Sequence, residues 1–225
     1  MDKETYVHDE VEIAAAVLLA AATVASAWCA FQAALWSGDE TRQLAKANSA
    51  HFESLRQSNE ANIDTLVDVT TFLSYLDHAS RGETKAVDFI RVHARPEFRP
   101  ALDAWINERE AGREPKSLPF KSALYRLAAS EAATVLGHEA QAATESANRA
   151  NGRSDIYVLY TVLFAMVLFF LGTASSARRR GTRRTMAVLG SLVFVLAVLS
   201  MLRLPRAPND LLRTTFRDRS ASAAD

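Results

Sequence analysis

The sequence predicts an all-α membrane protein, with three transmembrane helices and an antiparallel helical stalk and small helical cap between the first and second. Three long apolar runs carry no charged residue, and each approaches the ~20 residues that a helix needs to cross a bilayer. The segment between the first two runs shows helical rather than strand-like periodicity. The runs are Ile13–Ser37, Ile156–Ala177 and Met186–Leu202.

Overall composition hides this architecture. The 225 residues include 26 Lys and Arg against 26 Asp and Glu, and the mean hydropathy of -0.04 resembles that of a soluble domain. The average misleads because the apolar residues gather in the three runs and the charges lie between them. Balanced charge gives no basis for a nucleic-acid partner, so the lipid bilayer is the first partner expected.

The first run is either a retained transmembrane helix or a cleaved signal. Ala25-Ser26-Ala27 has the small-residue pattern of a cleavage site, but signal peptides begin with a positive segment. Here the leader, residues 1–12, is acidic, and the apolar character continues past the candidate cleavage site to residue 37. We therefore expect a retained first helix at residues 13–37.

That helix has small residues around most of its circumference. Small residues let helix backbones approach closely in lipid, so Ala15, Ala22 and Ser26 are candidate packing positions against the other spans or another copy. A general richness in alanine explains the same pattern without any function. Trp28 and Trp36 could anchor the exit end at the headgroups.

Residues 38–155 form the predicted extramembrane stalk and cap. The outgoing helix, Asp39–His78, carries one large apolar face, which we expect to be buried, and an opposite polar face that includes Asp64 and Asp68. Ser80-Arg81-Gly82 ends it. The apolar face consists of Phe52, Leu55, Ile63, Leu66, Val69, Leu73 and Leu76.

Two short helices, Thr84–His93 and Ala101–Glu110, form the expected cap on either side of a turn bounded by two prolines. A returning helix, Phe120–Arg153, is long enough to pair antiparallel with the outgoing one. Asn48 and Asn148 lie near the membrane end of this pair. They either set the register of the two helices, as buried asparagines do in coiled coils, or face solvent.

A transmembrane hairpin ends the chain, with helices at 156–177 and 186–204, a basic turn at 178–185 and a tail at 205–225. The short turn holds five arginines, which favours a cytoplasmic turn and N-terminus, with the stalk periplasmic or extracellular. Arginines in the tail compete with this orientation. The expected location is a bacterial inner membrane.

Few residues indicate chemistry. The sequence contains no phosphate-binding loop, nucleophile elbow or metal-binding motif, so we expect no catalytic residue, cofactor or metal. His51 and His138 could face each other across the stalk, but a histidine satisfied by its neighbours is the simpler interpretation. Coupled transporters carry ionisable groups within their spans, and none is present inside these runs.

The cap contains the most plausible partner-binding surface, because exposed arginines beside aromatic rings suit anionic or protein partners. The alternative is a solvated turn with the aromatic rings buried in the cap. The candidate residues are Arg95, Phe98, Arg99, Trp105, Arg109 and Arg113.

Several segments resemble an uncharacterised bacterial family of three-span membrane proteins. In that family Trp-Ser-Gly follows the first span, here Trp36-Ser37-Gly38, and a Tyr-Val-Leu-x-Thr-Val-Leu-Phe-Ala run opens the second, here residues 157–165. Residues 97–101 and 105–106 are also similar. The resemblance implies the three-span layout and no activity. The layout of span, stalk and span also resembles chemoreceptor sensor modules, at the level of fold only.

These observations predict a non-enzymatic membrane protein that acts through assembly or protein contacts, either as a homo-oligomer or with another membrane protein. A small-ligand sensor built on the helical bundle is the first alternative. A passive oligomeric pore is the second, although no span has a polar stripe to line it.

Overall fold

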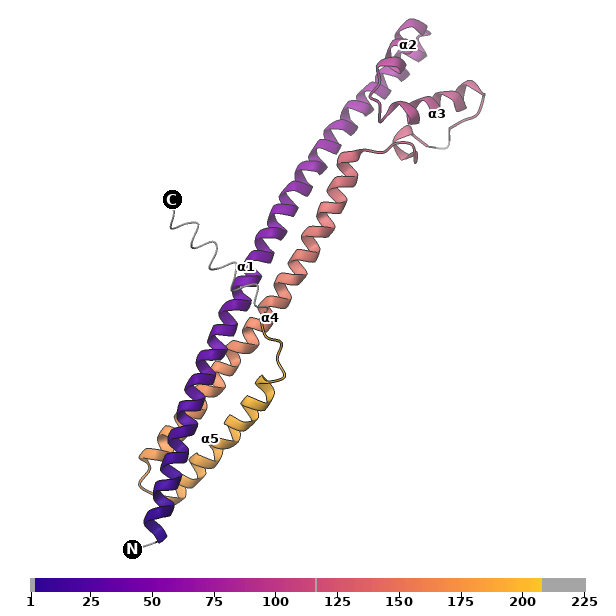
Figure 1. Cartoon of the computed structure of the whole chain (residues 1–225). Helices are drawn as coiled ribbons and strands as arrows, with labels where there is room; N and C mark the ends of the chain where they lie inside the picture. Colours follow the sequence, from indigo (N-terminus) through magenta and orange to yellow (C-terminus); the bar gives the residue numbers. More distant parts are fainter. Residues whose placement is uncertain (1–2, 116, 208–225) are drawn as a thin grey trace, which may run out of the picture. The chain divides into compact units, whose positions relative to one another are not determined.

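The computed structural model describes residues 3–115 and 117–207, and the backbone alone for residues 3–12. The described part is helical and contains no strand, which confirms the all-α class (Figure 1). The tail beyond residue 207 lies outside the described residues. The helices are α1 (Lys3–Ser80), α2 (Thr84–His93), α3 (Arg99–Glu110), the 3-10 turn η1 (Pro119–Lys121), α4 (Ala128–Ser176) and α5 (Arg180–Met201).

The chain divides into two compact units, and α1 and α4 each contribute to both. The span unit comprises Met1–Leu44 and Thr144–Asp225, and the stalk unit comprises Ala45–Ala143. Three helices, α1, α4 and α5, are long and apolar enough to cross a membrane, so the chain is a membrane protein. Charged residues recur throughout the stalk unit, which places that unit outside the hydrocarbon.

Helix α1 is much longer than a typical globular helix because Gly38 does not interrupt it. It ends where the sequence predicts. Gly82 adopts a left-handed conformation with φ of 72°, and the N–H of Glu83 donates to the carbonyl of His78 at 3.1 Å. This is the hydrogen-bond pattern of a helix C-cap. The residue after the helix end has a left-handed backbone conformation, which glycine adopts most readily.

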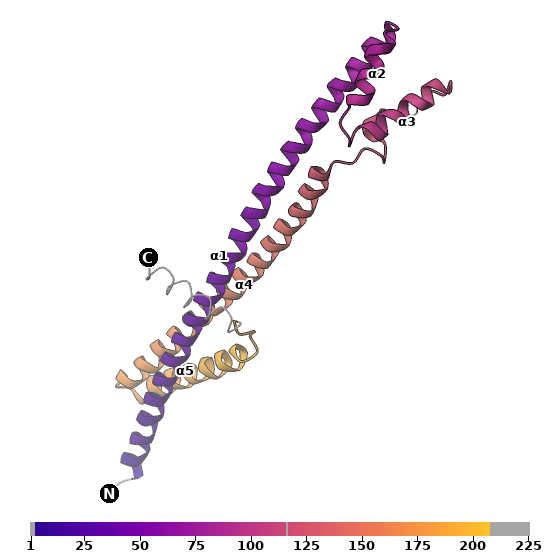
Figure 2. The same ribbon diagram turned by 45° about the horizontal axis from the view of Figure 1, so that its top comes forward.

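In the stalk unit α1 and α4 lie side by side in both views and run antiparallel (Figures 1 and 2). Lys46 pairs with Glu139 at 3.0 Å, and Ser54 Oγ donates to the carbonyl of Ala133 at 2.8 Å. The helices meet along an alanine seam, a set of small buried residues that permits close approach. The seam consists of Ala47, Ala50 and Ala61 of α1 and Ala133, Ala140 and Ala143 of α4.

Two expectations for the stalk need correction. The returning helix begins at Ala128 rather than Phe120, because residues 119–127 form a 3-10 turn and further turns that place Phe120 and Tyr125 against the cap. Asn48 and Asn148 are both exposed. Alanines occupy the buried positions beside them, so the asparagines do not set register within the chain.

The cap is an aromatic cluster at the far end of the stalk unit. Phe98 stacks on Phe120 with ring centroids 5.3 Å apart, and Phe72 meets the edge of Trp105 at 4.9 Å. Helix α3 begins at Arg99, two residues earlier than the sequence suggests, with Pro100 in its first turn. Proline is tolerated there because the first helical N–H groups have no intrahelical acceptor. The buried members are Phe72, Tyr75, Ala94, Phe98, Leu102 and Ile106.

The span unit packs α1, α4 and α5 around small and aromatic side chains. Ala22 is fully buried, as expected of a packing position, whereas Ala15 and Ser26 are half-buried. Trp36 is buried between helices and so is not a headgroup anchor. Gly190 of α5 lies so close to Leu171 that an added Cβ would come within 3.0 Å of its side chain.

Three buried polar side chains of the span unit are hydrogen-bonded to another segment of it, whereas the buried Trp36 indole N–H has no hydrogen-bond partner among the described residues. Ser154 Oγ donates to the carbonyl of Ala33 at 3.1 Å, the N–H of Ala207 donates to Gln32 Oε1 at 3.0 Å, and the Tyr157 hydroxyl donates to the carbonyl of Pro205 at 3.2 Å. These bonds give the polar residues of the spans a structural role, since an unpaired polar group in hydrocarbon is costly.

The basic turn is shorter than the predicted 178–185. Helix α4 ends at Ser176 and α5 begins at Arg180, because the backbone N–H of Arg183 already donates to the carbonyl of Arg179 at 3.1 Å. Arg183 and Arg184 therefore extend from the start of α5. Long arginine side chains at a helix end can reach the headgroups while the backbone stays helical.

Candidate interaction surfaces of the stalk unit

Three of the six predicted partner-binding residues hold the cap together. Phe98 is fully buried. Arg95 pairs with Asp64 at 2.7 Å and with Asp68 at 3.1 Å, and Arg99 donates to the carbonyls of Val92 and Ala94 at 2.6 and 3.1 Å. These contacts explain why a proline-bounded turn between α2 and α3 carries two arginines and an aromatic residue.

Asp68 is a buried carboxyl group, although the sequence pattern places it on the polar, solvated face of α1. Its side chain is fully buried, and Oδ2 accepts from the Tyr125 hydroxyl at 2.9 Å and from Arg95 at 3.1 Å. Burial raises the pKa of this carboxyl, against the opposing effects of the Tyr125 hydrogen bond and the Arg95 charge. Tyr125 comes from the turn before α4, so only the folded chain brings these groups together.

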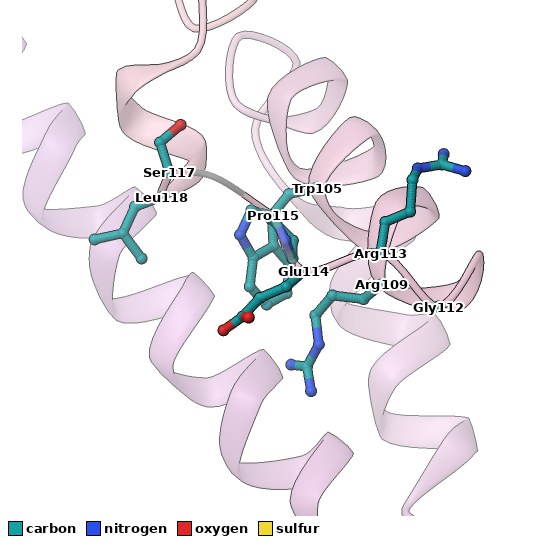
Figure 3. Close-up of a pocket in the computed structure, with 8 residues that line it drawn as sticks. All are labelled: Trp105, Arg109, Gly112, Arg113, Glu114, Pro115, Ser117 and Leu118. Carbon is teal, nitrogen blue, oxygen red and sulfur yellow. The ribbon is translucent and has the colours of Figure 1, made fainter.

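The remaining three candidates, Trp105, Arg109 and Arg113, border an open pocket of about 620 Å³ (Figure 3). The Arg109 guanidinium lies 5.1 Å from the centre of the Trp105 ring, which is the geometry of a cation–π pair. Figure 3 shows Arg113 directed away from that ring. The pocket offers an aromatic face, the positive charge of two arginines, the Glu114 carboxylate and the Ser117 hydroxyl.

A row of exposed apolar side chains runs along α1 in the stalk unit and is here called the α1 stripe. Most of the apolar face that the sequence predicts to be buried belongs to this stripe. In the single chain that prediction is therefore wrong. Only Val69 and Leu76 of the predicted face are partly covered. The stripe consists of Phe52 (72% exposed), Leu55 (48%), Ile63 (62%), Leu66 (65%), Val67 (48%) and Leu73 (58%).

The buried face of α1 is opposite to the predicted one, because α1 has two faces on which another helix could pack. The chain buries the narrow one, in which alanines and small polar residues meet α4. At about 100° per residue, the stripe falls on the opposite side of α1. A close approach between α1 and α4 requires small residues, so the bulky side chains are left outside.

Helix α2 lies along part of the stripe and forms an apolar groove of about 580 Å³ with it. Phe89 and Val92 of α2 are each 62% exposed beside this groove, so α2 extends the apolar surface instead of covering it. The groove is lined by Ile63, Leu66, Val67, Thr70, Thr71, Ser74, Phe89, Ile90 and His93.

Charges stand at the ends and borders of the stripe, and two of the pairs are satisfied within the chain. Arg56 pairs with Glu53 at 2.6 Å, and hydrogen bonds from Arg56 and Gln57 lower the pKa of Glu53 to about 2. Beyond Leu73, Arg81 pairs with Asp77 at 2.9 Å. The stripe itself is uncharged.

Among the described side chains, those of residues 13–115 and 117–207, no group of three or more His, Cys, Asp or Glu could hold a metal ion. His51 and His138 are both exposed. A comparison of the chain with protein-family models, with curated proteins and with solved structures found no match.

Proposed function

We propose that the chain is a non-enzymatic membrane protein whose stalk unit acts through contacts with other protein chains. The observation that carries this proposal is the α1 stripe, since contiguous apolar surface facing water is typical of protein interaction sites. Six large side chains in one row exceed the scattered apolar residues that monomeric proteins expose singly.

A bacterial inner-membrane location accords with the resemblance of the Trp36–Gly38 and 157–165 segments to a bacterial family. The arginine-rich end of the α4–α5 hairpin favours the cytoplasm. This orientation puts the N-terminus inside and the stalk unit in the periplasm or outside the cell. The seven-residue spacing of buried positions in α1 and α4 favours a short coiled coil in the stalk.

The assembly proposal is tested by purifying the full chain from native membranes in mild detergent and measuring its mass. We expect a complex heavier than the 24.7 kDa chain with its detergent. Leu66→Ser should weaken this complex, because it removes apolar surface from the stripe. Val135→Ser is the matched control, since Val135 is 67% exposed on α4 and outside the stripe. A single-chain species in every mild detergent would refute the proposal.

Orientation is tested by labelling intact cells with an impermeant thiol reagent in a Cys29→Ala background. A cysteine replacing Gly112 in the stalk unit should react, and one replacing Gly181 at the start of α5 should not. Neither glycine has a neighbour within 4 Å of an added Cβ. Gly112 has a φ of 71°, which strains any side chain there, so a cysteine replacing the exposed Glu114 is labelled in parallel. The reverse labelling pattern would place the stalk unit in the cytoplasm.

A further inference from the structure

We propose that the partner of the α1 stripe is a second copy of this chain, paired in parallel, α1 against α1, about a two-fold axis. The inference rests on the proposed function and gives it a specific partner. It is argued from the spacing of the stripe, from the orientation that a membrane imposes, and from the charges around the stripe.

The spacing of the stripe matches a helix-pairing seam. Phe52, Asn59, Leu66 and Leu73 stand seven residues apart, and Leu55, Ile63 and Thr70 fall between them on the same side of α1. A seven-residue apolar repeat keeps one face against a partner helix as the two wind around each other. Asn59 is the polar residue in this repeat, and a lone asparagine at such a position specifies register between parallel helices.

Membrane insertion decides the relative direction of the two copies. All copies of a chain with one topology cross the bilayer in the same sense, so two stalk units in one membrane run parallel. A two-fold contact between parallel helices places each residue opposite its own counterpart. Such a seam tolerates no unpaired charge, because every such charge would face its like.

The stripe meets that requirement. Its six members are uncharged. Arg56, which lies on this side of α1 between Leu55 and Ile63, and Asp77, which lies beyond Leu73, are paired within their own chain with Glu53 and Arg81. A different protein could contribute opposite charges, but the stripe offers none for it to match. A second copy offers apolar side chains of the same kind.

The apolar groove supplies the space for this contact. Its volume of about 580 Å³ exceeds that of several aliphatic side chains, so it can receive residues of the partner's α1, flanked by Phe89. The six exposed side chains form a patch on the order of several hundred Å², comparable with the central part of a standard interface of ~800 Å² on each partner. Covering it would remove these six apolar side chains from water.

Single-cysteine cross-linking of the full chain in its membrane tests the proposal. In a Cys29→Ala background, Phe52→Cys and Leu73→Cys should each form a disulfide with the second copy on oxidation, giving a band at twice the 24.7 kDa chain mass. Cross-linking at both sites identifies parallel pairing: the sites lie about 32 Å apart along the helix, and an antiparallel pair brings only its central residue against itself.

Gln141→Cys on α4 is the control, because Gln141 is exposed away from the stripe. The stripe cysteines should couple roughly tenfold faster or more than this control, since pairing raises their effective concentration. Equal rates at all three positions would overturn the inference. Coupling at only one of the two stripe positions would overturn the parallel arrangement.

A second measurement separates this inference from the broader proposal. Leu66→Lys places like charges opposite each other in the two-fold contact and should convert a twofold chain mass in mild detergent to a single chain, whereas Val135→Lys should not. A complex with another protein that survives Leu66→Lys would overturn the pairing of copies and leave protein contact as the function. A single chain in the unmodified protein would overturn both.

Discussion

The span unit and the stalk unit expose similar side chains to different surroundings. Val24 and Phe169 in the span unit are 70% and 66% exposed, and Phe52 and Leu66 in the stalk unit are 72% and 65% exposed. Lipid covers the first pair at no cost, because hydrocarbon is as apolar as the side chains. Water surrounds the second pair, and each such side chain costs about 1.5–3 kcal/mol relative to its burial. Equal exposure is therefore ordinary in the span unit, and in the stalk unit it is the observation that motivates the proposed protein contact.

The two units also differ in what holds their helices together. The span unit combines small residues such as Ala22 and Gly190 with hydrogen bonds from Gln32 and Ser154. The stalk unit has an alanine seam that ends in an aromatic cap, where Arg95 and Tyr125 contact the buried Asp68 carboxyl. Close approach replaces the hydrophobic effect where there is no water, whereas burial of large rings stabilises the unit that water surrounds.

The largest expected effect is the loss of the cap. Phe98→Ala should destabilise the cap by about 3–5 kcal/mol, because it leaves a cavity among stacked rings. Phe52→Ala should change the stability of the single chain by less than about 0.5 kcal/mol, because Phe52 is exposed and its truncation creates no cavity. Hydrogen exchange of the α3 amides measures the difference. Equal protection in the two variants would mean that Phe98 is not a core residue.

A smaller effect is expected for close packing in the span unit. Gly190→Ala should destabilise the unit by about 1–3 kcal/mol, since the new Cβ crowds Leu171. Gly172→Ala, for which no atom lies within 4 Å of the new Cβ, should be neutral or slightly stabilising. Thermal unfolding of the full chain in detergent compares them. Equal melting temperatures would show that α4 and α5 do not approach closely at Gly190.

The smallest expected effect is a pH dependence of the cap. Burial raises the folded pKa of Asp68 above its usual 3.8, so the folded cap favours the protonated carboxyl. This contribution to stability is therefore full below the unfolded pKa and lost as pH rises through the folded one.

Hydrogen exchange of cap amides between about pH 4 and pH 7, corrected for intrinsic rates, measures this dependence. The Asp68→Asn variant should lack the loss of stability that the unmodified chain shows on raising the pH. Arg95, Tyr125, Asp64 and Glu97 are the other charged or titratable groups around this carboxyl and are common to both proteins. Identical pH profiles would show that the Asp68 carboxyl does not titrate differently in the folded state.

Much of the fold follows from local patterns. Helix α2 has the predicted bounds, and α1 ends before Gly82 because glycine adopts the left-handed conformation there. The candidate site was less predictable. Asp68 shares a face with other polar residues, and nothing local signals that Tyr125 and Arg95 will enclose it. The alanine-rich stretch around residue 140 gave one usable signal, since a returning helix of small residues demands a matching small face on α1.

The sequence by itself determined three apolar helices, the positions of most helix ends and the presence of two different faces on α1, because these depend on hydrophobic periodicity and on the backbone preferences of single residues. Only the tertiary structure decided which face of α1 is covered. Periodicity measures how apolar a face is, but pairing within one chain depends on how closely two backbones can approach. Alanines of α4 fit against Ala47, Ala50 and Ala61 of α1, and that fit leaves Phe52, Ile63 and Leu66 facing outward.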